Sequence, residues 1–129
     1  MEALIIVPTY NERENIEALI GQIQKLDTGV ELGILVVDDN SPDGTGKFVE
    51  DLSRTRRGVH VLHRPRKLGL GSAYIAGFKW ALERPGVKYV FEMDADFSHD
   101  PGAIRTFLSE IENADLVLGS RYLNGVTVI

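Results

Sequence analysis

Residues 89–100 of this chain read Tyr-Val-Phe-Glu-Met-Asp-Ala-Asp-Phe-Ser-His-Asp, an apolar segment that leads directly into a cluster of carboxylates. This pattern predicts a buried strand followed by a loop that carries Asp94 and Asp96. In an open α/β sheet, ligands bind at the carboxyl ends of the strands. The two carboxylates are therefore candidate ligands of one Mg²⁺, which proteins usually hold with one or two carboxylates, water and a substrate phosphate. The alternative is a surface turn, in which Asp residues hydrogen-bond nearby backbone groups.

The rest of the sequence alternates between apolar segments and helical patterns. Strands are predicted over residues 3–7, 32–37, 59–62, 89–93 and 116–118. Helices are predicted from Asn11, which would form a capping box with Glu14, from the residues after Gly46, from Ser72, and from Asp100, which would cap a helix with Pro101 at its first position. This alternation predicts an α/β sandwich with a mostly parallel sheet.

Each loop that follows a predicted strand is rich in polar residues, glycine or proline. These loops are residues 8–12, 38–46, 63–71, 94–100 and 119–122. Because parallel strands end at the same edge of a sheet, the five loops are expected to meet there. They would form one composite site. Five such loops at one edge are stronger evidence for a ligand-binding site than any single motif.

Composition narrows the class of protein. The chain has 129 residues, of which 43% are hydrophobic, so it is long enough to form one globular domain with a core. Its net charge of -5 argues against a nucleic acid as the main partner. The absence of cysteine excludes disulfides, zinc thiolates and a thiol nucleophile. The sequence shows neither a signal peptide nor an apolar run near the ~18 residues that span a membrane.

The five loops resemble those of the inverting glycosyltransferases of family two. The matching stretches are Pro-Thr-Tyr-Asn-Glu (8–12), Val-Asp-Asp-Asn-Ser-Pro-Asp-Gly-Thr (37–45), Lys-Leu-Gly-Leu-Gly (67–71), Asp-Ala-Asp with Ser98 and His99 (94–99), and Gly-Ser-Arg-Tyr (119–122). The second and third favour the branch of the dolichol-phosphate (polyprenol-phosphate) mannose synthases. The resemblance implies a GT-A type fold, which is a nucleotide-binding α/β domain.

The resemblance also implies roles for individual residues. The implied nucleotide-sugar contacts are Pro8, Tyr10, Glu12, Val37, Asp38, Asp39, Lys67, Gly69, Asp94, Ala95, Asp96 and Arg121. Tyr10 would stack on the base or ribose, and Asp39 would accept two hydrogen bonds from guanine. Asp38 would either support Asp39 or bind the ribose. Glu12 could equally be a first-turn helix acid without a ligand.

The implied catalytic residues are Asp96 and Arg121, and the implied metal ligands are Asp94 and Asp96, for Mg²⁺ or Mn²⁺. The implied reaction moves mannose with inversion from GDP-mannose to a polyprenyl or dolichyl phosphate. That acceptor is already ionised near pH 7, so no protein base is needed, and Arg121 would face its phosphate or the phosphates of the donor. A surface arginine without a ligand is the alternative for Arg121.

The resemblance places the protein at the cytoplasmic face of a membrane, as a peripheral protein whose anchoring segment or subunit lies outside this chain. Family catalytic domains are longer, so residues 1–129 are interpreted as the donor-binding part, shortened at its C-terminal end. Two alternatives stay open: a polyprenyl-phosphate glucose synthase that uses UDP-glucose, and a fragment that only binds nucleotide. A dinucleotide-dependent oxidoreductase is disfavoured, because Gly69 and Gly71 follow a basic loop instead of a strand.

Overall fold

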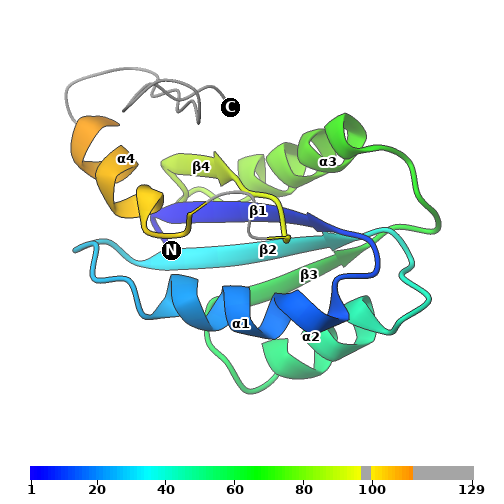
Figure 1. Ribbon diagram of the computed structural model, residues 1–129. Coiled ribbons are helices and arrows are strands. Elements are labelled where there is room, and N and C mark those ends of the chain that lie inside the picture. The colour runs from blue at the N-terminus through cyan, green and yellow to red at the C-terminus, as the bar shows by residue number, and fades with distance from the viewer. Residues whose placement is uncertain (97–99, 112–129) are drawn as a thin grey trace, which may run out of the picture.

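A four-stranded parallel sheet forms the centre of the protein, as the computed structural model shows for residues 1–96 and 100–111 (Figure 1). The strands are β1 (Ala3–Thr9), β2 (Leu32–Asp38), β3 (Val59–His63) and β4 (Tyr89–Glu92). Their order is β3-β2-β1-β4, and every neighbouring pair is parallel. The predicted mostly parallel α/β architecture is confirmed. The strand predicted over 116–118 lies outside the described residues.

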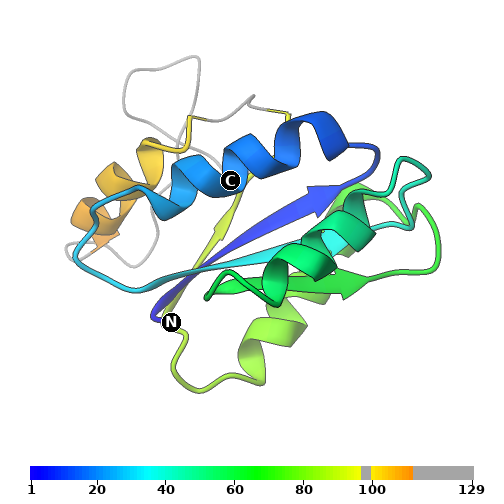
Figure 2. The same ribbon diagram turned by 90° about the horizontal axis from the view of Figure 1, so that it is seen from below.

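Helices cover both faces of the sheet, which gives three layers. They are α1 (Arg13–Gln24), α2 (Thr45–Ser53), α3 (Leu70–Leu82) and α4 (Ala103–Ile111). Helices α1 and α2 lie on one side of the sheet and α3 lies on the other (Figures 1 and 2). Among the described residues, no helix combines the length and the apolar character needed to cross a membrane.

The central strand β1 separates two hydrophobic clusters. Its alternate side chains Ala3, Ile5 and Val7 pack with apolar residues of α1, α2 and α4. Leu4 and Ile6 point to the other face and pack against α3. All five of these side chains are fully buried, as expected for a parallel strand that is covered on both faces.

Strand β1 is longer than predicted, because Pro8 does not end it. Pro8 is paired with Val37 and the ladder continues to Thr9. The ladder with β4 already ends at Ile6, whose carbonyl accepts a hydrogen bond from the Met93 N–H. The N–H that a proline lacks would point toward this side, beyond the last pair, so no ladder hydrogen bond is lost.

The predicted cap of α1 is wrong. The N-cap residue is Glu12, without a capping hydrogen bond from its side chain, and Asn11 has a φ of 56°. The Asn11 side chain instead accepts a hydrogen bond from the Asp43 N–H at 3.2 Å. Asn11 thus contacts the loop after β2, and these contacts between two loops outweigh its preference to cap the helix.

The other predicted helix starts are also displaced. Helix α3 begins at Leu70, two residues before Ser72, and α4 begins at Ala103. Asp100 does accept a hydrogen bond from the Gly102 N–H at 2.9 Å, but this turn precedes α4, so Pro101 is not the first helical residue. The predicted inner face of α4 is confirmed for Ile104, Phe107 and Leu108; the side chain of Ile111 lies outside the described part of the chain.

Helix α3 approaches the sheet closely at Gly77. A Cβ atom placed on Gly77 would lie 2.7 Å from two carbon atoms of the buried Ile6 side chain. Gly71, on the same helix, has nothing within 4 Å of such an atom. Alanine substitutions at these two positions therefore distinguish two effects. At Gly71 only the helix preference of alanine acts, whereas at Gly77 the limited space against the sheet acts as well.

We expect Gly77→Ala to destabilise the fold by about 1–3 kcal/mol, because the added methyl group overpacks the contact with Ile6. Gly71→Ala should instead raise the free energy of unfolding by about 0.5–1 kcal/mol, because alanine favours the helix. Chemical denaturation of both variants measures the difference. Equal effects of the two substitutions would contradict the close approach of α3 to β1.

Candidate active site at the carboxyl edge of the sheet

A cleft of ≈ 260 Å³ opens where β1, β2 and β4 end and α3 begins. Of the residues predicted to bind a nucleotide sugar, Pro8, Tyr10, Glu12, Asp39, Lys67, Gly69, Asp94, Ala95 and Asp96 line it. Thr9, Leu70 and Ala73 complete its walls and were not predicted. The expected meeting of loops at this edge of the sheet is therefore seen for the loops in the described residues.

Val37 and Asp38, also among the predicted contacts, do not line the cleft. The Val37 side chain has no exposed surface and packs in the core against α3, because residue 37 is an inward-facing position of β2. A contact of Val37 with a base would therefore come from its backbone, since its side chain is enclosed by the core. Arg121 lies outside the described residues.

The buried carboxylate of Asp38 joins the ends of the two central strands. It is 2% exposed and accepts hydrogen bonds from the Thr9 hydroxyl at 2.7 Å, the Ser41 hydroxyl at 2.6 Å and the Ser41 N–H at 3.0 Å. Asp38 does not line the cleft. Of the two roles that the sequence left open, these contacts favour support of the neighbouring loop over contact with a ribose.

The loop after β2 also holds the loop after β1. Ser41 accepts a hydrogen bond from the Asn11 N–H at 2.9 Å, Thr45 accepts one from the Glu12 N–H at 3.0 Å, and Asp43 accepts one from the Arg13 N–H at 3.0 Å. The side chains of this stretch thus replace the sheet ladder beyond the last strand residues. Much of the Ser-Pro-Asp-Gly-Thr stretch is a scaffold for the wall of the cleft.

Asp43 contributes a carboxylate to this scaffold. Burial alone would raise the pKa of its carboxyl group. Hydrogen bonds from the Thr45 hydroxyl and from the N–H groups of Arg13 and Thr45, together with the nearby charge of Arg13, hold the pKa below its usual value instead. Asp43 is therefore a strong acceptor at neutral pH.

Arg64 is a site residue that the sequence analysis missed. It donates to both carboxylate oxygens of Asp39, from Nε at 2.6 Å and from Nη2 at 2.8 Å, and both side chains are nearly buried. The same guanidinium donates to the Ser72 hydroxyl at 2.7 Å and to the Gly69 carbonyl at 3.2 Å. Arg64 thereby ties the ends of β2 and β3 to the start of α3.

The position of Arg64 follows from the strand register. Asp38 pairs with His63, so Asp39 and Arg64 are the next residues of two adjacent strands. The sequence alone showed only a basic, glycine-rich loop, because the order of the strands in the sheet was not known. Knowledge of that order would have brought the two opposite charges together.

The Arg64 contact changes what Asp39 can offer to a ligand. A carboxylate has about four acceptor positions. Arg64 uses two of them, and the Leu68 N–H donates to Oδ2 at 3.2 Å. About one position is left, whereas the expected contact with guanine needs two. Guanine could donate one hydrogen bond to Asp39, or a second one after Arg64 or Leu68 moves.

Aromatic and basic groups form another wall of the cleft. The Lys67 Nζ lies 4.8 Å from the centre of the Tyr10 ring, whose side chain is 38% exposed. The Glu12 carboxylate accepts a hydrogen bond from the Asn15 side chain at 3.1 Å. This wall offers a flat ring and one ammonium group, which suit a base or ribose and a phosphate, respectively.

Asp94 and Asp96, on the loop after β4, both line the cleft. The Tyr74 hydroxyl, on α3, donates to Asp94 Oδ1 at 2.9 Å. Burial of Tyr74, followed by the charge of Asp94, raises the pKa of this phenol, so it remains a proton donor at neutral pH. Within residues 1–96 and 100–111, no group of three His, Cys, Asp or Glu side chains could hold a metal ion by itself.

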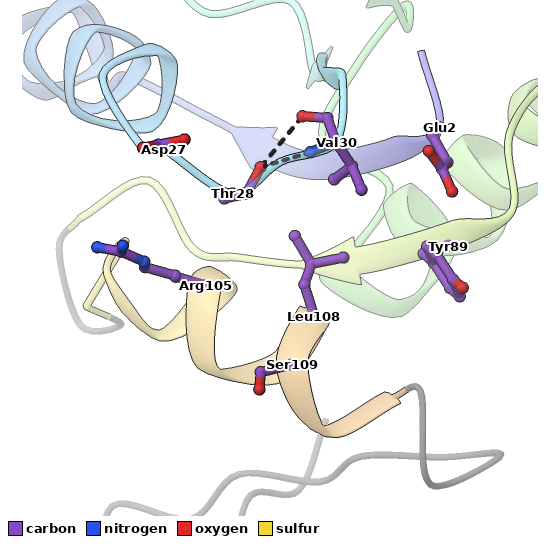
Figure 3. A pocket seen from close by; sticks show the side chains of 8 residues that line it. All are labelled: Glu2, Asp27, Thr28, Val30, Tyr89, Arg105, Leu108 and Ser109. Carbon is purple, nitrogen blue, oxygen red and sulfur yellow. Dashed lines mark hydrogen bonds between the residues drawn. The ribbon is translucent and has the colours of Figure 1, made fainter.

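A larger cavity of ≈ 430 Å³ lies at the opposite edge of the sheet (Figure 3). It is lined by Glu2, Asp27, Thr28, Val30, Tyr89, Arg105, Leu108 and Ser109. None of the predicted binding residues that the structure describes lies there, and the strands present their amino ends. Because ligands of open α/β sheets bind at the carboxyl ends, the smaller cleft is the candidate active site.

Comparisons with known sequences agree with the loop motifs. The profile described as "Glycosyl transferase family 2" matches residues 4–128. An undecaprenyl-phosphate mannosyltransferase of Micrococcus luteus is 49% identical over 125 residues, which are 97% of this chain and 50% of the relative. A polyprenol monophosphomannose synthase of Mycolicibacterium smegmatis is 49% identical over 127 residues, which are 97% of this chain and 47% of the relative. A dolichol-phosphate mannosyltransferase of Pyrococcus furiosus is 43% identical over 126 residues, with 97% and 34% covered.

This chain therefore spans half the length, or less, of these curated relatives. Solved structures confirm the GT-A type of fold. S. aureus TarS 1-349 in complex with UDP aligns with a TM-score of 0.71 and 25% identity, covering 100% of this chain and 38% of that chain. The mannosyltransferase PcManGT from Pyrobaculum calidifontis, in complex with GDP-Man and Mn²⁺, aligns with a TM-score of 0.67 and 22% identity, covering 91% and 33%. The latter likeness shows the fold alone.

We expect Asp38→Asn to lower the free energy of unfolding by about 1–3 kcal/mol, because an amide nitrogen replaces one buried acceptor and faces a hydroxyl or an N–H group. Thermal and chemical denaturation measure this loss. Asp51→Asn is the matched control, since Asp51 is an exposed partner in surface ion pairs and should change stability little. If both variants are as stable as the parent, the Asp38 contacts do not hold the loops.

Proposed function

This chain belongs to the glycosyl transferase family 2, and we propose that it forms the donor-binding part of an enzyme that transfers mannose from GDP-mannose to a polyprenyl phosphate. The proposal covers residues 1–129 as a part of a longer catalytic domain. The names of the curated relatives support it. Two are named mannosyltransferases, one is named a monophosphomannose synthase, and each name includes a polyprenyl lipid. The single observation that carries it is the cleft that gathers Asp39, Lys67, Asp94 and Asp96 at the carboxyl edge of the sheet.

The donor nucleotide would lie along this cleft. Tyr10 is exposed enough to stack on the base or ribose, and Asp39 would accept a hydrogen bond from the base. Pro8, Glu12, Gly69 and Ala95 complete the walls, and Lys67 would face the diphosphate. Asp38 acts behind this wall, through Ser41 and Thr9.

A divalent cation, Mg²⁺ or Mn²⁺, fits the chemistry of these residues. Two carboxylates from one loop border a cleft that would also hold the diphosphate of the donor. The carboxylates and the diphosphate are all negatively charged. Mg²⁺ is commonly bound by one or two carboxylates together with substrate phosphates, so the small number of protein ligands suits it. We propose Asp94 and Asp96 as the ligands. When bound, the cation would offset the charge that develops on the leaving diphosphate.

The acceptor would enter as an anion. An oxygen of the polyprenyl phosphate forms the new bond to C1 of mannose, while the bond from C1 to the diphosphate breaks, and GDP leaves. Attack from the side opposite to the leaving group inverts the configuration. The attacking oxygen is already ionised near neutral pH, so the protein positions it and need not remove a proton. We propose Arg121 for this task, at the surface of the membrane that carries the lipid.

UDP-glucose is the second candidate donor, and one observation favours it. Asp39 has room for about one more hydrogen bond, which matches the single N–H of uracil in that position better than the two donors of guanine. The alignment with the UDP complex of TarS is compatible with this donor. A comparison of the affinities for the two nucleotides would therefore distinguish the two candidate donors best.

The experiment is a calorimetric titration with GDP and with UDP, each with Mn²⁺ and with EDTA, followed by a transfer assay with GDP-mannose and UDP-glucose and a polyprenyl phosphate. We expect GDP to bind at least tenfold tighter than UDP, and mannose to reach the lipid. Preference for UDP and transfer of glucose would establish the second candidate. Absence of nucleotide binding would reject both.

We expect Asp96→Asn to remove most of the dependence of GDP affinity on Mn²⁺, because the loop loses one of its two charged ligands. Stability without metal should stay the same or rise, because two carboxylates no longer repel each other. Titrations in Mn²⁺ and in EDTA measure the first effect. Asp27→Asn, at the opposite edge of the sheet, is the control and should leave the metal dependence intact. An unchanged dependence in Asp96→Asn would place the metal elsewhere.

A further inference from the structure

A buried tyrosine stands behind the acidic loop of the cleft. Tyr74 belongs to α3, is 9% exposed and packs with Leu4 and Ile6 in the core on that face of the sheet. Its hydroxyl donates to Asp94 Oδ1 at 2.9 Å. Asp94 lines the cleft, whereas Tyr74 does not. The tyrosine therefore contacts the carboxylate from the side of the core.

We infer that Tyr74 is a positioning residue, which holds the Asp94 carboxylate in the orientation in which it binds a divalent cation and nucleotide diphosphate. This inference rests on the proposed function. It assigns to α3 a part in metal binding that neither the motifs nor the comparisons assign to it. Tyr74 acts through Asp94 and touches neither the nucleotide nor the cation.

The structure makes Tyr74 suitable for this role. Asp94 stands two residues beyond the end of β4, where the ladder with β1 no longer fixes the backbone on its own. The Tyr74 ring is enclosed by the core, so its hydroxyl has a fixed position. A hydrogen bond from a fixed donor restricts the rotation of the carboxylate, and such outer partners of metal ligands commonly change metal affinity 10–100-fold.

A plain structural role is the competing explanation. A buried tyrosine hydroxyl needs an acceptor, and Asp94 would be the nearest one. In that case removal of the hydroxyl would change stability but not the coupling between metal and nucleotide. Positioning predicts the opposite: a change in the metal-dependent part of binding and no change in metal-free binding.

The test is Tyr74→Phe, which keeps the ring and removes only the hydroxyl. Its control is Tyr89→Phe on β4, which removes a hydroxyl at the opposite edge of the sheet. Calorimetry would measure GDP affinity with Mn²⁺ and with EDTA, and electron paramagnetic resonance would count free Mn²⁺ in titrations with MnCl₂ alone. We expect Tyr74→Phe to reduce the enhancement of GDP binding by Mn²⁺ at least tenfold, with affinity in EDTA within about twofold of the parent. Tyr89→Phe should match the parent in both.

A second comparison separates positioning from packing. In an Asp94→Asn background, Tyr74→Phe should have no further effect on Mn²⁺ binding, because its hydroxyl acts only through the Asp94 carboxylate. Retention of the full enhancement by Tyr74→Phe, or an equal loss in EDTA, would overturn the inference alone. A parent protein whose GDP binding ignores Mn²⁺ would reject the proposed metal site and, with it, the role of Tyr74.

Discussion

The hydrogen bonds that join Asp38 to Thr9 and Ser41 are the constraint on which the site depends. The parallel ladder between β1 and β2 ends at the pair of Thr9 and Asp38, and most of the residues that line the cleft follow the ends of the strands. Past that point the backbones diverge into loops that cannot continue the ladder. A buried carboxylate, followed by the side chains of Ser41, Asp43 and Thr45, supplies acceptors where strand partners are missing.

Much of the fold could be predicted from the sequence, because continuous apolar runs and helical spacing reflect burial directly. The core positions of β1 and α1 follow from this pattern. Element boundaries were less accurate for identifiable reasons. Pro8 stays within β1 because its nitrogen faces the side on which the ladder with β4 has already ended. The Asn11 side chain binds the Asp43 N–H and does not cap α1. Both depend on neighbours that are distant in sequence.

The candidate site, like the fold, could be predicted from the sequence only in part. The residues in the motifs were predicted to gather at one edge, and those in the described loops do so, since the strand direction alone places them there. Their partners were missed. Arg64 meets Asp39 only because β3 lies beside β2, and Tyr74 meets Asp94 only because α3 packs close to β1, where Gly77 lets it approach. Spacing along the sequence contains neither of these facts.

The two missed partners act differently on the charges of the cleft. The Arg64 guanidinium offsets the charge of Asp39 within the protein, so a neutral base can approach an ordered acceptor without meeting an isolated anion. The Tyr74 hydroxyl is neutral, so it can orient Asp94 without cancelling its charge. A carboxylate that must attract a cation benefits from the second kind of partner, because an arginine in that place would compete with the metal. The arginine behind one carboxylate and the tyrosine behind the other are therefore consistent with the proposal that Asp39 meets the base and Asp94 the cation.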